Sequence, residues 1–173
     1  MIKRTSLSVL LFLAILASSC IWDLNDDDPD IIVDPPFESA YEPVILPRDS
    51  FETSTVLIDT KPIEETGKIY IKDQYLLINE PNEGFHIYNN SDPSNPIKIK
   101  FLKVLGSSDI SIKGNVLYIN NAVDLIAVTF NSDFSDIQIT KRVKNVFPIM
   151  ISPDGFYADP ANDEVVVDWI LIN

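Results

Sequence analysis

The sequence predicts an all-β fold: a partial β-propeller-like array of about two four-stranded blades plus a partial third, after a signal peptide and a disordered tether. Three observations carry this prediction. From about residue 41 onward, short apolar runs alternate with clusters of Gly, Asn, Asp and Pro, which is typical of many short strands. Residues 97–101 alternate strictly between apolar and polar side chains, as in a strand with one buried face. A segment of about 40 residues recurs, and this is the period of a propeller blade.

The N-terminus has the three parts of a secretory signal peptide. Lys3 and Arg4 give it a positive charge, residues 7–17 are apolar, and small residues precede a cysteine at position 20. A helix needs roughly 20 apolar residues to cross a bilayer, and this run has only about eleven. We therefore predict a cleaved signal over residues 1–19 rather than a permanent transmembrane helix.

The cysteine that follows indicates a particular type of signal peptide. Residues 16–20 (Leu-Ala-Ser-Ser-Cys) resemble the lipobox of bacterial lipoproteins, in which the cysteine sulfur is lipidated and becomes the first mature residue. The resemblance implies that Cys20 is the lipidation site and that the membrane is a partner through this lipid. The family usually has Leu three positions before the cysteine, where this chain has Ala17. Cys20 is the only cysteine, which excludes an intrachain disulfide and a cysteine-based zinc site.

Residues 20–40 form an acidic, proline-containing segment with no helical or strand period, which predicts a disordered tether. The aspartates just after Cys20 resemble the signal that places some lipoproteins on the outer face of the outer membrane. We therefore expect an outer-membrane lipoprotein of the cell envelope, exposed at the surface. Removal of Lys3 and Arg4 leaves 13 − 2 = 11 basic against 26 acidic residues, a net charge of −15. This charge argues against nucleic acid and anionic lipid as partners, because phosphates would be repelled.

Residues 41–173 are predicted to form a β-repeat domain. The predicted strands are residues 69–71, 75–79, 85–88 and 97–101 in one set, and 110–112, 116–120, 125–129 and 137–143 in the next.

The two sets of strands are copies of one another. Ile71-Lys72 recurs as Ile112-Lys113, 41 residues later, and other identities follow at the same offset without a gap. We define repeat units over about residues 67–107 and 108–148, with a partial unit over residues 149–173 that contains a predicted strand at 164–170.

Residues 75–96 resemble the LVIVD repeat family. In that family a strand of the type glycine–hydrophobic–Ile–hydrophobic–Asp is followed by Ser-Asp-Pro-x-x-Pro. Here the strand begins at Gly84, with Asn89 or Asn90 in place of the final Asp, and Ser91-Asp92-Pro93-Ser94-Asn95-Pro96 match the turn. The second copy has Phe134 and Ile137 in place of the two prolines, so its match is weaker. The resemblance covers about residues 67–147 and implies propeller blades in exported bacterial proteins without catalytic activity.

Two repeats and a fraction do not close a propeller, which needs about four to eight blades. Three arrangements remain open: a truncated reading of a longer chain, an open β-sandwich, or closure by oligomerisation. We expect truncation, because the sequence stops on an apolar strand.

The sequence offers few groups for catalysis. His86 is the only histidine, and strand alternation between Phe85 and Ile87 predicts that its side chain faces solvent. No phosphate loop, HExxH motif or histidine–cysteine zinc set is present, so we predict no catalytic residues, no metal and no cofactor. Asp92 and Asp133 occupy the same repeat position, which predicts that both cap turns. Asn79 and Asn120 are likewise expected where a strand enters a turn.

These features predict a non-catalytic binding or scaffold module with a protein or glycan ligand. Four aromatic residues, if exposed, would suit a glycan: Tyr41, Tyr70, Tyr88 and Trp169. Aromatic residues in strands nevertheless more often pack in the interior. Two alternatives are a lipoprotein subunit of a larger envelope assembly and, less favoured, an acid-based hydrolase that uses paired carboxylates.

Overall fold

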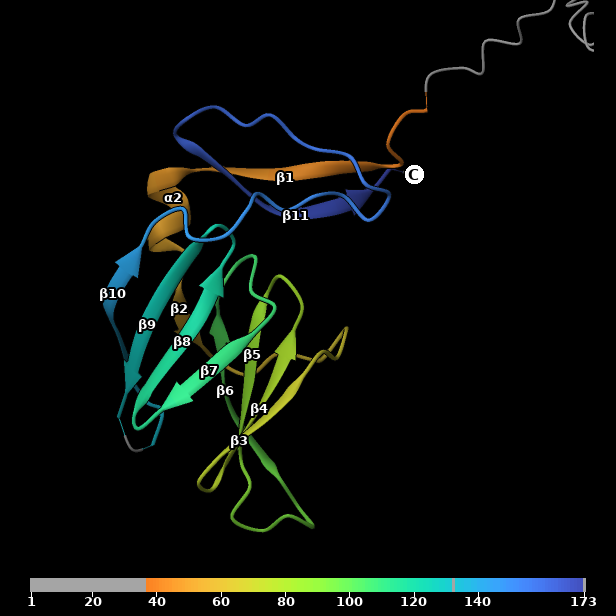
Figure 1. Cartoon of the computed structure of the whole chain (residues 1–173). Helices are drawn as coiled ribbons and strands as arrows, with labels where there is room; N and C mark the ends of the chain where they lie inside the picture. Colours follow the sequence, from red (N-terminus) through yellow and green to blue (C-terminus); the bar gives the residue numbers. More distant parts are fainter. Residues whose placement is uncertain (1–36, 132, 173) are drawn as a thin grey trace, which may run out of the picture. The chain divides into compact units, whose positions relative to one another are not determined.

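The computed structural model of the chain describes residues 37–131 and 133–172, which belong, apart from Phe37, to the unit Glu38–Asn173. These residues form three antiparallel sheets, none of them closed, and one helix, α2 (Arg48–Thr53) (Figure 1). The five-stranded sheet has the order β2 (Val56–Ile58), β6 (Ile97–Lys103), β5 (Gly84–Asn89), β4 (Tyr75–Glu80), β3 (Ile69–Lys72). The four-stranded sheet has the order β10 (Ile137–Val143), β9 (Asp124–Phe130), β8 (Val116–Asn121), β7 (Ile110–Lys113). A two-stranded ribbon pairs β1 (Tyr41–Pro47) with β11 (Glu164–Leu171). The all-β prediction is confirmed for the described residues.

Each of the eight predicted repeat strands is present, as β3 to β10, and the predicted strand near the C-terminus is β11. Three elements, β1, α2 and β2, were not predicted from the sequence. Pro43 and Pro47 weaken the strand pattern of β1, which pairs with a segment more than a hundred residues away in the sequence. Both β2, with three residues, and α2, with six, are too short to give a periodic signal.

The register of the two larger sheets defines which positions of the repeat are equivalent. Ile69, Ile71 and Leu76 of the five-stranded sheet correspond to residues 41 positions later in the four-stranded sheet, because each makes the same cross-strand pair. The offset is 40 for β5 and β9, since Leu76 pairs with Tyr88 and Leu117 pairs with Val128. The alignment without a gap is therefore wrong by one residue along β9. The cause is the hairpin between β8 and β9, which has two linking residues where the earlier hairpin has three.

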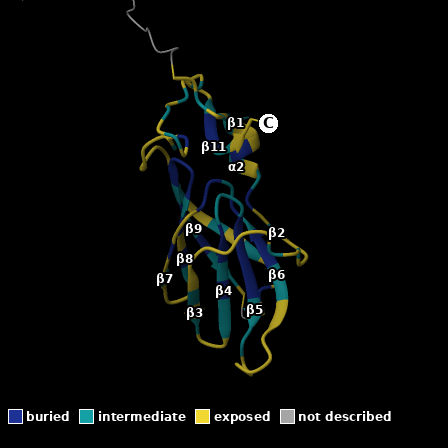
Figure 2. Cartoon of the chain, turned by 90° about the vertical axis from the view of Figure 1, so that its right-hand side faces the viewer, coloured by how far each residue is buried: buried dark blue, intermediate teal, exposed yellow. Residues whose placement is uncertain are grey.

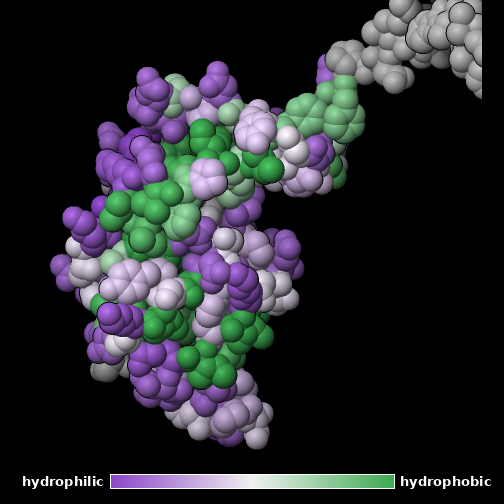
Figure 3. Space-filling view, in the orientation of Figure 1, coloured by the Kyte–Doolittle hydropathy of each residue, from purple (hydrophilic) through white to green (hydrophobic). Residues whose placement is uncertain are grey.

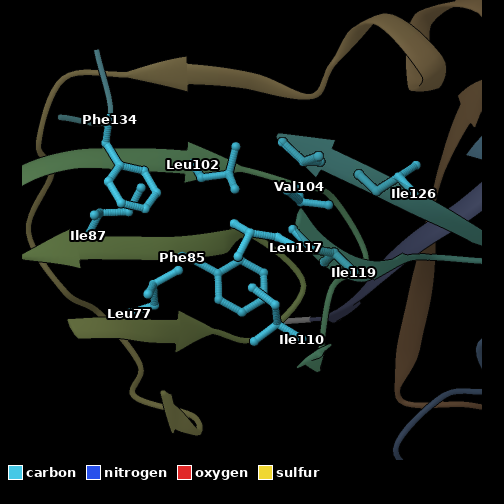
Figure 4. Packing of buried hydrophobic residues seen from close by; sticks show 11 residues of the cluster. Leu77, Phe85, Ile87, Leu102, Val104, Ile110, Leu117, Ile119, Ile126 and Phe134 are labelled. Atoms are coloured by element: carbon cyan, nitrogen blue, oxygen red, sulfur yellow. The ribbon is translucent and has the colours of Figure 1, made fainter. Parts of the chain in front are cut away.

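The main core lies between the five-stranded and the four-stranded sheet (Figure 4). The five-stranded sheet contributes fully buried side chains from its three central strands: Leu77, Phe85, Ile87 and Leu102. The four-stranded sheet contributes those of β8 and β9: Leu117, Ile119, Ile126 and Val128. Burial of each such side chain stabilises the fold by about 1.5–3 kcal/mol relative to full exposure. Apolar packing between two stacked sheets is thus the main source of stability.

Phe134 enters this core from the connection between β9 and β10. Its ring stacks on Phe130 with centroids 4.0 Å apart, and its edge meets Tyr75 at 4.6 Å. The backbone of Phe134 has a φ of +52°, a left-handed conformation that a bulky residue rarely adopts. Packing of the ring between the sheets compensates this backbone strain, which explains why the second copy departs from the proline of the first.

A second, smaller core joins the ribbon and α2 to the hairpin between β8 and β9. Phe51 of α2 is fully buried there, and Val165 and Val167 of β11 pack with Ala122 and Val123 of the hairpin. The ribbon therefore has its own apolar attachment to the repeat sheets.

Candidate binding site

His86 is buried, so the prediction that its side chain faces solvent is wrong. Only 1% of the residue is exposed, its Nε2 lies 2.5 Å from Oε2 of Glu80, and its ring contacts Phe101 with centroids 4.7 Å apart. The connection between β2 and β3, residues 59–68, causes this burial. It runs across the strands of the five-stranded sheet, where it is drawn mainly as exposed chain (Figure 2). Lys61 of the connection extends over the Phe101 ring at 4.9 Å.

Glu80 is the centre of an ion cluster beneath this connection. It accepts a hydrogen bond from the backbone N–H of Glu64 at 3.0 Å, and Lys61 Nζ lies 3.3 Å from its carboxylate. Burial opposes its ionisation, but the bonds from Glu64, His86 and Lys61 outweigh burial and lower the pKa of Glu80. The carboxylates of Glu64, Glu80 and Glu83 gather within 4.8 Å, the spacing of a metal site, but Lys61 supplies positive charge and also contacts Glu83. The cluster therefore fastens the connection to the sheet.

A second buried ion cluster surrounds Asp124 at the start of β9. Its carboxylate is fully buried and receives Nη1 of both Arg48 and Arg142 at 2.9 Å. The backbone N–H of Asn145 donates to it at 3.0 Å, and both guanidinium groups lie over the Phe51 ring, at 5.5 and 5.3 Å. Burial disfavours the charged form, but the bonds from Asn145, Arg142 and Arg48 outweigh it and lower the pKa of Asp124. All its partners belong to the fold, so the cluster holds α2 against the four-stranded sheet.

The turn and strand-end residues take structural positions. Asp92 accepts the backbone N–H of Ser94 at 3.0 Å, and Asp133 accepts that of Ser135 at 3.2 Å, which confirms that both cap turns. Asn120 accepts the backbone N–H groups of Ser108 and Asp109 at 3.0 and 2.8 Å, and thereby fixes the connection that leads into β7.

The four aromatic residues considered for a glycan surface do not share one face. Tyr70 pairs with Leu77 on one face of the five-stranded sheet, whereas Tyr88 pairs with Leu76 on the other. Tyr41 and Trp169 belong to the ribbon. All four are half-buried, which favours packing over a glycan platform.

An apolar groove of about 680 Å³ lies on the outer face of the four-stranded sheet, the face turned away from the main core. Figure 3 shows hydrophobic side chains, in green, gathered in patches on the side of the molecule seen in Figure 1. The connection before β7, the strands and the hairpin between β8 and β9 contribute Gly106, Ser108, Asp109, Ile110, Ser111, Tyr118, Asn120, Ala122 and Leu125. The chain after β10 contributes Phe147, Pro148 and Met150. Such an apolar concavity with a few polar groups is the usual form of a binding site.

Hydrogen bonds hold the segment that forms one wall of the groove. The backbone N–H groups of Val146 and Phe147 donate to the carbonyl of Val123 at 2.8 and 2.9 Å. The indole N–H of Trp169 donates to the carbonyl of Met150 at 3.2 Å. The segment is therefore fixed at both ends although it contains no strand, and for that reason the strand pattern could not reveal the groove.

Asp109 is the charged residue among those that line the groove. Its carboxylate accepts the hydroxyl of Tyr70 at 2.6 Å and also pairs with Lys68, so it joins the two larger sheets. Burial and the Asp109 carboxylate raise the pKa of Tyr70 to about 12, and Tyr70 remains a neutral hydrogen-bond donor at neutral pH.

The predicted lipidation site, Cys20, lies outside the described residues, as do the signal peptide and most of the tether. Within residues 37–131 and 133–172, no helix has the length and hydrophobicity needed to cross a membrane. Comparison of the chain with protein-family models, curated proteins and solved structures finds no match.

Proposed function

We propose that the protein is a lipid-anchored protein of the cell envelope whose β-repeat domain binds another protein without catalysing a reaction. The observation that carries this proposal is the apolar groove of about 680 Å³ on the outer face of the four-stranded sheet. A protein surface suits this groove better than a glycan does, because Leu125, Phe147 and Met150 offer apolar contact and few polar groups.

The anchor in this proposal is the lipid on Cys20, at the outer membrane and facing outward. It rests on the signal peptide, the small residues before Cys20 and the acidic segment that follows. Several acyl chains on one cysteine hold a protein stably, since each buried methylene contributes about 0.8 kcal/mol.

The proposed architecture is a partial β-propeller-like array of the LVIVD type. Two consecutive antiparallel four-stranded units, β3 to β6 and β7 to β10, follow one another at the same spacing and stack face to face, which supports this assignment. A partner that completes the array would explain why exposed isoleucines remain on the five-stranded sheet. The alternative function, a subunit of a larger envelope assembly, gains support from the same residues, Ile69 and Ile71.

A photo-crosslinking amino acid in place of Tyr118 tests the groove directly. In the full chain, produced in cells that export it, irradiation is expected to attach a second protein to the Tyr118 variant. The matched control is the same replacement at Tyr157, which is 80% exposed and does not line the groove. No adduct at position 118, or equal adducts at both positions, would contradict the binding function.

Labelling with a fatty-acid analogue tests the anchor separately. The wild-type chain is expected to incorporate the label and Cys20→Ser to lose it entirely. A Cys20→Ser variant that still carried the label would overturn the anchor and leave the groove result unaffected.

A further inference from the structure

We infer that the groove receives a second copy of this chain, stacked head to tail through the open face of its five-stranded sheet. The open face is the part of the face turned away from the main core that residues 59–68 leave uncovered, and it carries Ile69, Ile71 and Leu76 of β3 and β4. This inference rests on the proposed binding function, and it names the partner.

The contact between the two larger sheets within one chain is the template for the proposed contact between two copies. There the four-stranded sheet presents Ile110, Ile112 and Leu117, and all three belong to the main core or pack against it. The equivalent residues of the five-stranded sheet are Ile69, Ile71 and Leu76, which make the same cross-strand pairs. The open face thus has the chemistry of a face that already binds a sheet elsewhere in the same chain.

Residues 59–68 cover the part of this face that carries His86 and Phe101, but the β3 edge of the face has no neighbour within the described chain. Ile110 is 6% exposed, whereas Ile69 is 62% exposed. Ile112 is half-buried, whereas Ile71 is 69% exposed. Aliphatic side chains that are clustered and this exposed mark an interaction surface.

The groove-bearing face is equivalent to the other half of the internal contact. Tyr70, Leu77, Phe85 and Ile87 form that half in the five-stranded sheet, and their equivalents are Ser111, Tyr118, Leu125 and Ala127. None of these four replacements is charged, so no charge would be buried at the centre of the stack. Ser111 and Ala127 are smaller than Tyr70 and Ile87, which leaves room for the isoleucines of an incoming sheet.

Charge supports the same register at the edge of the stack. Inside the chain, Lys68 of the five-stranded sheet pairs with Asp109, which precedes β7. Asp109 stands at the position equivalent to Lys68, 41 residues later. The equivalent contact between copies therefore places Asp109 of one chain against Lys68 of the next, and these charges are opposite.

Such a contact joins two different surfaces, so it builds rings if the rotation closes and filaments if it does not. Each chain supplies two stacked sheets. Two to four copies would supply the roughly four to eight blades of a closed propeller.

Cross-linking between single-cysteine variants tests the stack. Ile71→Cys and Tyr118→Cys, each on a full chain that also carries Cys20→Ser and its own tag, are produced in the same cells and treated with a short bis-maleimide. Their internal equivalents, Ile112 and Leu77, belong to one core cluster, and stacked sheets lie about 10 Å apart, within reach of the reagent. We expect a dimer that carries both tags, at least tenfold above the level from Ile170→Cys paired with Tyr118→Cys. Ile170 is 52% exposed on the ribbon and serves as the matched control.

Three results would overturn the stack. These are equal cross-linking by the control pair, dimers of Ile71→Cys with itself in place of mixed dimers, and no mixed dimer at all. The photo-crosslink at position 118 separates this failure from failure of the binding function. An adduct with a different protein would retain binding and reject the second copy, whereas the absence of any adduct would reject both.

Discussion

The two larger sheets present the same face in two different environments. In the four-stranded sheet, Leu117 and Ile119 on this face are fully buried against the five-stranded sheet. In the five-stranded sheet, the equivalent Leu76 and Ile78 are only half-buried. The cross-strand pairs of β3 with β4 and of β7 with β8 are the same, so the difference in exposure comes from what packs on each face: a whole sheet in one case and only residues 59–68 in the other. Each copy of the β-repeat therefore has an apolar face that can pack on a neighbouring sheet, whether or not a neighbour is present.

The comparison also extends to the buried charges. Asp124 starts β9 at the position where β5 has Gly84, and the polar partner in the five-stranded sheet is instead Glu80. Each carboxylate fastens a segment outside the repeat: Asp124 holds α2, and Glu80 holds the connection of residues 59–68. The repeat therefore tolerates different polar clusters at the same end of the sheet.

The largest expected effect is on stability, from truncation of the buried member of an equivalent pair. Leu117→Ala should lower the free energy of unfolding by about 2–5 kcal/mol, because it leaves a cavity in the main core. Leu76→Ala should lower it by only about 1 kcal/mol, since its side chain is half-buried. Urea unfolding of the two variants and the wild type measures the difference, and equal losses would contradict the proposed equivalence.

The next effect comes from the buried charge clusters. Asp124→Asn should cost about 2–3 kcal/mol, because it leaves two guanidinium groups without their carboxylate. Glu80→Gln should cost less, about 1 kcal/mol, because Lys61 keeps its contact with Glu83 and is more exposed than the arginines. Thermal unfolding ranks the two variants. A greater loss of stability from Glu80→Gln than from Asp124→Asn would contradict the assignment of Asp124 to the stronger cluster.

The same clusters predict how stability depends on pH. The pKa of both Asp124 and Glu80 is lowered in the folded protein, so their stabilising contribution is present above their unfolded pKa values of about 3.9 and 4.3. It is lost as the pH falls from these values through the lower folded ones. We expect the wild-type melting temperature to begin to fall as the pH is lowered from about 5 to about 3. Asp124→Asn should show a shallower fall, and an equally steep fall would contradict this role.

The smallest effect concerns the hairpin turns of the two sheets. Asp73 has a φ of +53° in the turn between β3 and β4, where the second copy has Gly114 at +57°. Glycine adopts this conformation without steric cost, so Asp73→Gly should stabilise the fold by up to about 1 kcal/mol. Gly114→Asp, the reverse change, should destabilise it by a similar amount. Chemical denaturation of both variants measures these shifts, and shifts of the same sign would contradict the equivalence of the turns.

The strands were predictable because their signals are local. Ile97 to Phe101 alternate along the chain itself, and the recurrence of Ile71-Lys72 places the second set of strands without knowledge of the fold. The one-residue shift along β9 was not predictable. Beyond β9 the offset between the copies is again 41, as Asn90-Ser91-Asp92 and its copy show, so an alignment without a gap looks correct.

The groove and the burial of His86 depend on contacts between segments distant in the sequence. Strand alternation places His86 correctly on the face opposite Phe85, but only the fold shows that residues 59–68 cover this face. The groove likewise exists because Phe147 and Met150 are held beside β8 by bonds to Val123 and Trp169. No periodic pattern marks such contacts.

Thiol reactivity at one equivalent pair tests whether the exposed edge of the five-stranded sheet is a stacking surface. Ile69→Cys and Ile110→Cys, each in a full chain that also carries Cys20→Ser, are labelled with a small maleimide at several protein concentrations. We expect a slow, concentration-independent labelling rate at position 110 and a fast rate at position 69 that falls as the protein concentration rises and copies stack. Equal rates at the two positions, or a rate at position 69 that is fast at every concentration, would contradict it.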